Sequence, residues 1–122
     1  MNNIATLTRV QTWEDFHLFL KTFLNYHSEL QDQLTGYPAL SYQLSYKSEA
    51  NRAVLIGHRM KTFVLLCEDF ICLHREQLHE SVLSYWCSLN KFLEFAEQGI
   101  EKEVALALTL ELIRLLRLAI PK

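Results

Sequence analysis

The chain has 122 residues, of which half are hydrophobic, while only three are glycine and two are proline. This composition excludes a disordered tail, a collagen-like repeat and a loop-rich disulfide scaffold. Twelve Lys and Arg against fourteen Asp and Glu give a formal net charge of −2, which argues against a strongly basic nucleic-acid-binding protein. We expect a single domain over residues 1–122, with 1–11 as a loose N-terminal segment.

Two features favour a cytoplasmic location. The first residues have neither a basic start nor a continuous apolar core, so they do not resemble a secretory signal. Three cysteines, an odd number in apolar surroundings, are typical of reduced thiols rather than of a disulfide framework. The most apolar stretch, 104–120, is short and includes Glu111, Arg114 and Arg117, so we expect no membrane span.

The first amphipathic segment predicts a helix over 12–35. Thr12, followed three residues later by Asp15, is typical of a capping box, and Gly36 stands where a helix-ending glycine is expected. Between them, apolar and aromatic side chains recur at spacings of three and four, which places them on one face of a helix. The members of this stripe are Phe16, Leu20, Phe23, His27, Leu30 and Leu34.

The connection that follows, 37–48, has two interpretations. Tyr42 and Tyr46 are four residues apart, which allows a short extra helix near 39–47, whereas an ordered connection with aromatic tips fits equally well. Tyr37, Tyr42 and Tyr46 are also candidates for contacts with a partner, because tyrosine is enriched at the energetic centres of interfaces. The alternative role for these rings is to cover the core.

Residues 49–98 contain no proline and a single glycine, so they predict either two helices or one long bent helix. Ser48 is a candidate cap for a helix that begins at Glu49. The polar cluster at 74–77 is the most favourable place for a break, which gives helices over 49–73 and 77–98.

The last segment predicts a helix over 100–119, and apolar side chains cover most of its circumference. Such a helix belongs in the middle of a bundle or at an interface, and a domain of this size buries few helices on every side. Leu108, Leu112 and Leu115 form a candidate seam for a homodimer or a complex with another protein. The sequence therefore predicts an all-α fold, an antiparallel bundle of about four helices without a sheet.

A group of potential metal ligands falls between residues 67 and 79. Cys67 and Cys72 are five residues apart, so on a helix they diverge by about 140°, and neither Cys-x-x-Cys nor His-Glu-x-x-His is present. His74 and His79 also belong to the group, and they too are five residues apart rather than three or four. We expect no metal and no cofactor, with the cysteines acting as small core residues.

Arg52 and His58 are separated by five residues, Ala-Val-Leu-Ile-Gly. This spacing resembles the signature of the HEPN nucleases, in which an Arg is followed by a His after four to six residues. The resemblance implies a helical bundle that dimerises and cleaves RNA with paired Arg and His side chains. The family often has a polar residue directly after the Arg, where this chain has Ala53, and the resemblance covers only this spacing.

These observations favour a binding module over an enzyme. No glycine-rich phosphate loop and no nucleophile motif is present, while apolar residues concentrate in the last helix. We expect a protein that binds a protein partner, as an adaptor, chaperone, antitoxin or immunity-type protein does, with nucleic acid binding disfavoured. The alternative is a HEPN-like RNA-cleaving enzyme that uses Arg52 and His58, and a third hypothesis is a sensor that holds an apolar ligand between helices.

Overall fold

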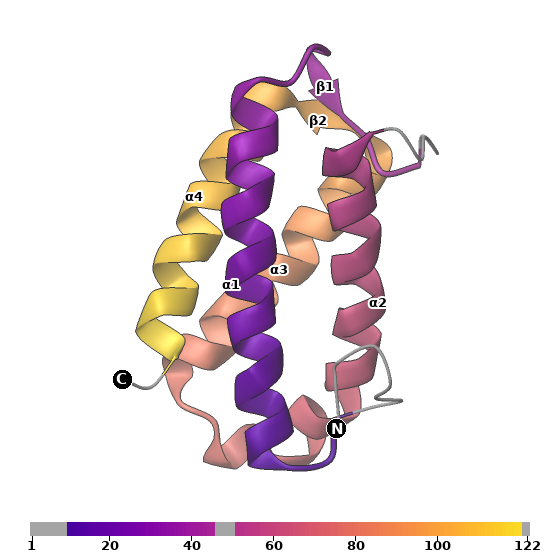
Figure 1. The fold of residues 1–122 in the computed structure, drawn as a ribbon. Helices are drawn as coiled ribbons and strands as arrows, with labels where there is room; N and C mark the ends of the chain where they lie inside the picture. The colour runs from indigo at the N-terminus through magenta and orange to yellow at the C-terminus, as the bar shows by residue number, and fades with distance from the viewer. Residues whose placement is uncertain (1–9, 46–50, 121–122) are drawn as a thin grey trace.

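A computed structural model of the chain describes residues 10–45 and 51–120. Four long helices run alternately up and down, as Figure 1 shows: α1 (Trp13–Thr35), α2 (Arg52–Leu73), α3 (Glu80–Gln98) and α4 (Lys102–Ala119). α1 packs against both α2 and α4, and α3 packs against α4. The predicted all-α antiparallel bundle is confirmed.

The ends of the helices follow from local chemistry. The predicted capping box of α1 is present, because the Asp15 amide donates to Thr12 Oγ1 at 3.1 Å and the Thr12 amide donates to the Asp15 carboxylate at 3.3 Å. α2 begins at Arg52 rather than at the expected residue 49, since the Asn51 side chain accepts a hydrogen bond from the Val54 amide. Ser48, the candidate cap, lies outside the described residues.

The predicted break between the second and third helices is confirmed. α2 ends at Leu73, a 3₁₀ turn covers Arg75–Gln77, and α3 begins at Glu80 with His79 as its cap. This break turns the chain around, so that α3 runs back antiparallel to α2 (Figure 1). The interpretation of 49–98 as one long bent helix is therefore wrong.

The connection between α1 and α2 is extended where the structure describes it, so the predicted short helix near 39–47 is wrong over its described part. β1 (Ser41–Tyr42) pairs antiparallel with β2 (Ile100–Glu101), which lies between α3 and α4. The expectation of a fold without any sheet is corrected to this extent. Side chains here alternate between exposed and buried, the period-two pattern of a strand, and Tyr42 and Leu44 are the buried ones.

Two glycines allow the connection between α1 and α2 to pair with β2 and to pack against α2. Gly99, directly before β2, has a φ of 103°, a conformation that glycine adopts at little cost. Gly57 in α2 has no room for a Cβ atom, which would collide with the side chains of Tyr42 and Leu44. Gly57 therefore lets the connection after β1 lie directly against α2.

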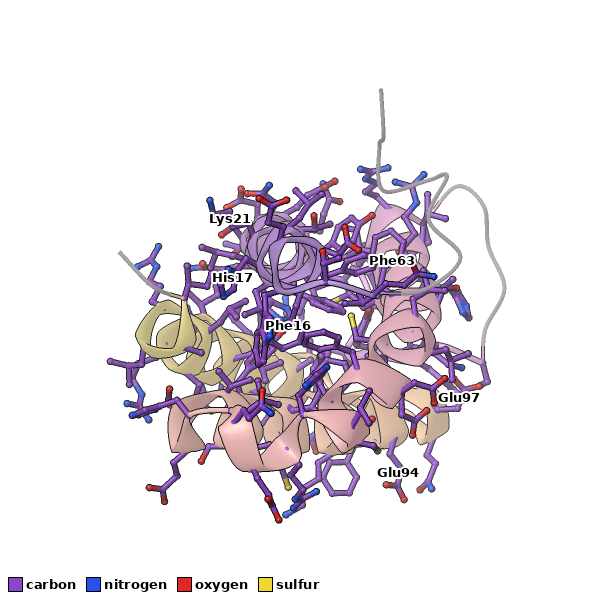
Figure 2. The ribbon with its side chains drawn as sticks, turned by 90° about the horizontal axis from the view of Figure 1, so that it is seen from below. Phe16, His17, Lys21, Phe63, Glu94 and Glu97 are labelled. Atoms are coloured by element: carbon purple, nitrogen blue, oxygen red, sulfur yellow. The ribbon has the colours of Figure 1, made fainter. Side chains whose placement is uncertain are left out.

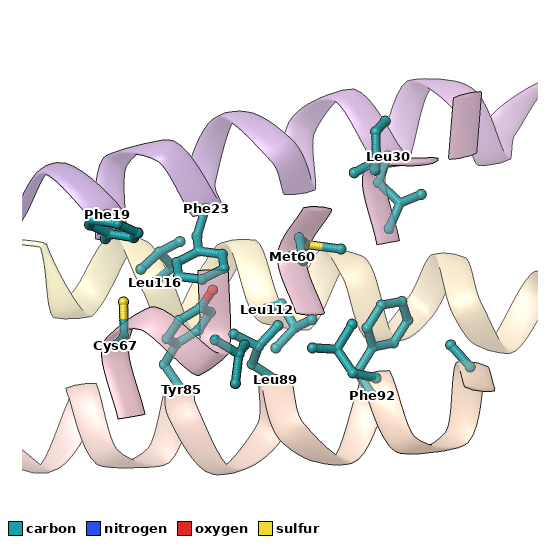
Figure 3. Packing of buried hydrophobic residues seen from close by; sticks show 14 of the residues in the cluster. Phe19, Phe23, Leu30, Met60, Cys67, Tyr85, Leu89, Phe92, Leu112 and Leu116 are labelled. Carbon is teal, nitrogen blue, oxygen red and sulfur yellow. The ribbon is translucent and has the colours of Figure 1, made fainter. Parts of the chain in front are cut away.

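The core lies along the axis of the bundle, and all four helices contribute to it. Phe19 and Phe23 of α1 lie across from Tyr85 and Leu89 of α3, with Leu112 of α4 between them (Figure 3). Aromatic rings pack edge to face in several places, for example Phe19 on Phe63 and Phe23 on Trp86. The apolar stripes of the helices thus meet inside one chain.

Candidate functional site

The fourth helix uses one side to complete the core. Leu112 is only 1% exposed, and Leu108 and Leu115 are half-buried and pack against the core cluster. The candidate seam of Leu108, Leu112 and Leu115 therefore faces the interior of its own chain. Leu112 has no surface left for a partner in the folded monomer.

The opposite side of α4 carries a second apolar surface that nothing in the described chain covers. Val104, Leu110 and Leu118 are 45%, 46% and 64% exposed, and Ala107 between them is exposed as well. α4 lies at an outer edge of the bundle (Figures 1 and 2), so a partner can approach this surface freely. We name the set Glu103, Val104, Ala107, Leu110, Arg114, Arg117 and Leu118 the α4 outer face.

Charges on the α4 outer face have an ordered arrangement. Glu103 lies in the first turn of α4 and Arg117 in the last turn, positions at which each charge is favourable toward the helix dipole. Near the middle, Arg114 Nε donates to Glu111 Oε2 at 3.0 Å, and the guanidinium lowers the pKa of Glu111. The centre of the face is therefore neutral, while its ends carry opposite charges.

A groove runs alongside this face, between α4 and α1. Its volume is about 510 Å³, and its wall on α1 includes Gln31. The α4 side of the groove is lined by Leu110, Ile113, Arg114, Arg117 and Leu118. The α4 outer face thus offers both a ridge of exposed side chains and a depression into which a partner's side chain can insert.

The two described tyrosine candidates are engaged within the chain. The Tyr42 hydroxyl is buried and donates to the carbonyl of Ala53 at 2.8 Å, and burial raises the pKa of this hydroxyl. The half-buried Tyr37 accepts a hydrogen bond from Asn51 Nδ2 at 2.8 Å. Both side chains fix the connection between α1 and α2 against α2, as lids on the core do. Tyr46 lies outside the described residues.

Arg52 and His58 do not form a common site within the chain. Two guanidinium nitrogens of Arg52 donate to the carboxylate of Glu29 on α1, and the pair lowers the pKa of Glu29. His58 is half-buried, and its Nε2 has no hydrogen-bond partner among the described residues. On α2 the two side chains point about 120° apart, because they are six positions apart along the helix.

The potential metal ligands are also dispersed. Cys67 is buried, whereas Cys72 and Cys87 are exposed, so the role of a core residue holds for Cys67 alone. Within residues 10–45 and 51–120, no three His, Cys, Asp or Glu side chains lie close enough to hold a metal ion. No helix in these ranges combines the length and the apolar character needed to cross a membrane.

The core contains one polar pair that the apolar pattern hides. His27, on the inner stripe of α1, is fully buried, and its Nε2 shares a hydrogen bond of 2.6 Å with the Tyr85 hydroxyl of α3. Burial lowers the pKa of His27 to about 3, so the ring is neutral at physiological pH. Both side chains are fully buried, which makes the pair a structural rather than a reactive feature.

A second surface groove lies between α2 and α3. It has a volume of about 350 Å³, and its apolar wall includes Leu65, which is 69% exposed. Glu94 and Glu97 project from α3 at its rim, away from the core (Figure 2). Lys61 Nζ donates to Glu97 Oε2 at 2.5 Å and so links the two helices.

No protein-family model matches the chain, and neither a curated protein nor a solved structure matches it.

Proposed function

We propose that this protein is a binding module that associates with a protein partner through the α4 outer face. One observation carries the proposal: α4 leaves large apolar side chains at Val104, Leu110 and Leu118 in water, although its other side already completes the core. An exposed apolar surface of this kind, with polar residues around it, is typical of a protein–protein interface.

The physical driving force is the burial of these side chains. Removing apolar surface from water contributes about 25 cal/mol per Å², before the cost of ordering both partners is subtracted. The 18 residues of α4 form a rigid ridge about 27 Å long, so little conformational freedom is lost on binding. Adaptors, chaperones, antitoxins and immunity proteins are the classes of protein that work in this way.

The RNA-cleaving alternative has less support. It needs Arg52 free to contact a phosphate, whereas Arg52 is bound to Glu29, and it needs His58 beside that arginine rather than on another face of α2. The binding proposal includes a cytoplasmic location, which is supported by three free cysteines, two of them exposed, because a reducing compartment preserves such thiols.

The proposal is tested by co-purification from the native host with matched surface variants. We expect a tagged wild-type chain to retain a stoichiometric partner, either another protein or an untagged copy of the chain, and Leu110→Glu to lose it. Leu65→Glu is the control, since it places the same charge on an exposed leucine of the α2–α3 groove. Loss of the partner from the Leu65 variant alone would assign binding to that groove instead, and retention in both variants would exclude the α4 outer face.

The same experiment separates binding from folding. Leu110→Glu adds a charge to a side chain that is already half in water, so circular dichroism and the melting temperature should change little. Leu112→Glu buries a carboxylate in the core and should unfold the chain. If Leu110→Glu unfolds the protein as Leu112→Glu does, the α4 outer face is part of the core and the proposal is wrong.

A further inference from the structure

We infer that the partner of the α4 outer face is a second copy of this chain, and that the two α4 helices pair antiparallel around Leu110. The inference rests on the proposed function, because it uses the same face. It follows from the order of charges and apolar side chains along α4, which is complementary to itself only when one helix is reversed.

The charges at the two ends select the direction. Glu103 and Arg117 are both exposed on this face, fourteen residues or about 21 Å apart, with Leu110 midway between them. In an antiparallel pair, Glu103 of each copy lies opposite Arg117 of the other, so two attractive contacts form. A parallel pair would place Glu103 against Glu103 and Arg117 against Arg117, and this repulsion disfavours it.

The apolar residues follow the same symmetry. Leu110 meets Leu110 of the second copy at the two-fold axis, and Val104 of each copy lies opposite Leu118 of the other. Ala107 is small, so it leaves space for the aliphatic stem of the opposing Arg114. Every exposed apolar side chain of the face therefore has an apolar or aliphatic neighbour in the pair, as a self-complementary interface requires.

The surroundings of the face fit this arrangement as well. The salt bridge between Glu111 and Arg114 neutralises the charges nearest the axis within each chain, so pairing leaves no unbalanced charge there. The groove between α4 and α1 borders Leu118, where Val104 of the second copy can insert. The interface is the same patch on both copies, so association stops at a dimer rather than continuing into a filament.

The test is sedimentation equilibrium on the full chain, with a reducing agent present because Cys72 and Cys87 are exposed. Measurements from about 1 μM to about 1 mM cover the range of typical weak and moderate dimers. We expect a mass that rises to twice the 14.3 kDa of one chain. A monomer throughout this range would overturn the inference.

Charge reversal then tests the direction of pairing. Glu103→Arg and Arg117→Glu each create two repulsive contacts in the antiparallel dimer, and each should raise the dissociation constant at least about tenfold. The double variant Glu103→Arg/Arg117→Glu restores two attractive contacts and should dimerise like the wild type. A double variant no tighter than the single variants would overturn the antiparallel arrangement.

The double variant also excludes a simpler role for these charges. Glu103 and Arg117 both favour the α4 dipole, so each reversal weakens the helix, and the double variant weakens it at both ends. If the charges served only the helix, the double variant would be the least stable chain and would dimerise least. Melting temperatures measured at low concentration report this effect on the monomer separately.

A cross-linking experiment gives the register directly. In a background of Cys72→Ser and Cys87→Ser, Leu110→Cys should form a disulfide between copies on mild oxidation, since disulfides need Cα atoms within about 7 Å. Leu118→Cys should not, because the two copies of this position are about 24 Å apart in the antiparallel pair. Cross-linking at both positions would indicate a parallel pair and contradict the inference.

The inference and the proposed function can fail separately. If the chain stays monomeric but Leu110→Glu loses a different protein from the host, the α4 outer face binds that protein and only the self-pairing is wrong. If Leu110→Glu changes neither the mass of the purified chain nor its complexes, the proposed function is wrong as well.

Discussion

Acidification should destabilise this protein through His27 in the core. The ring is fully buried, its Nε2 is bonded to the Tyr85 hydroxyl, and its Nδ1 has no partner among the described residues. Tyr85 of α3 cannot neutralise a positive charge on the ring, because burial raises the pKa of this hydroxyl well above its usual value. A proton on His27 would therefore be an uncompensated buried charge.

The size and sign of the effect follow from the two pKa values of His27. The pKa is 6.5 for an unperturbed histidine and about 3 in the folded protein. As the pH falls below 6.5, His27 becomes protonated in the unfolded chain but stays neutral in the folded chain. The free energy of unfolding therefore falls until the pH approaches 3. At 1.36 kcal/mol per pKa unit, the loss between pH 7.5 and pH 5 is about 2 kcal/mol.

Urea unfolding of the wild type and of His27→Gln at these two pH values measures the effect. Glutamine does not titrate and can still exchange a hydrogen bond with Tyr85, while all other titratable groups are common to both proteins and cancel in the difference. We expect the wild type to lose about 2 kcal/mol more than the variant between pH 7.5 and pH 5. Equal losses would show that His27 is not held neutral in the core.

Three further results are expected. Leu112→Ala should lower the free energy of unfolding by about 2–5 kcal/mol in urea titrations, because it opens a cavity between helices. Gly57→Ala should lose about 1–3 kcal/mol in the same assay through the collision of its methyl group with Tyr42 and Leu44, and regain about 1 kcal/mol through the higher helix propensity of alanine, so a net gain of about 1 kcal/mol would refute the close packing of this connection on α2. With a thiol reagent, the two exposed cysteines should react in the native protein, whereas Cys67, whose pKa burial raises to about 12, should react only after unfolding.

The helices could be predicted from the sequence because their signals are local. Thr12, Asp15 and Gly36 define α1 by capping chemistry, and the polar cluster after Leu73 separates α2 from α3. The sequence predicts the start of α2 three residues too early, since Ser and Asn are comparable caps and only the structure shows that Asn51 accepts the hydrogen bond.

The strand pair was missed because two periodicities overlap in the connection. Tyr42 and Tyr46 suggest a helical spacing of four, but Ser41 and Gln43 alternate with Tyr42 and Leu44 at a spacing of two. The second pattern is the correct one, and it depends on a partner strand at Ile100–Glu101 that is far away in the sequence.

The candidate site could not be predicted from the sequence for a different reason. Apolar residues cover so much of α4 that the sequence defines several equivalent stripes, and Leu108, Leu112 and Leu115 form only one of them. The buried line in the structure includes the small residues Ala105 and Thr109, which let α4 lie close to its neighbours. Which stripe remains outside is decided by this packing, so Leu110 could not be singled out beforehand.

The central claim, that the protein acts through binding by the α4 outer face, is tested most directly by complementation of a deletion strain of the native host. Leu110→Glu and His58→Ala are compared at equal protein levels, with folding verified by circular dichroism. We expect Leu110→Glu to fail to restore the wild-type phenotype and His58→Ala to restore it. If His58→Ala is the only variant that fails to restore the wild-type phenotype, although it is folded and correctly assembled, the protein is an enzyme and the binding claim is wrong.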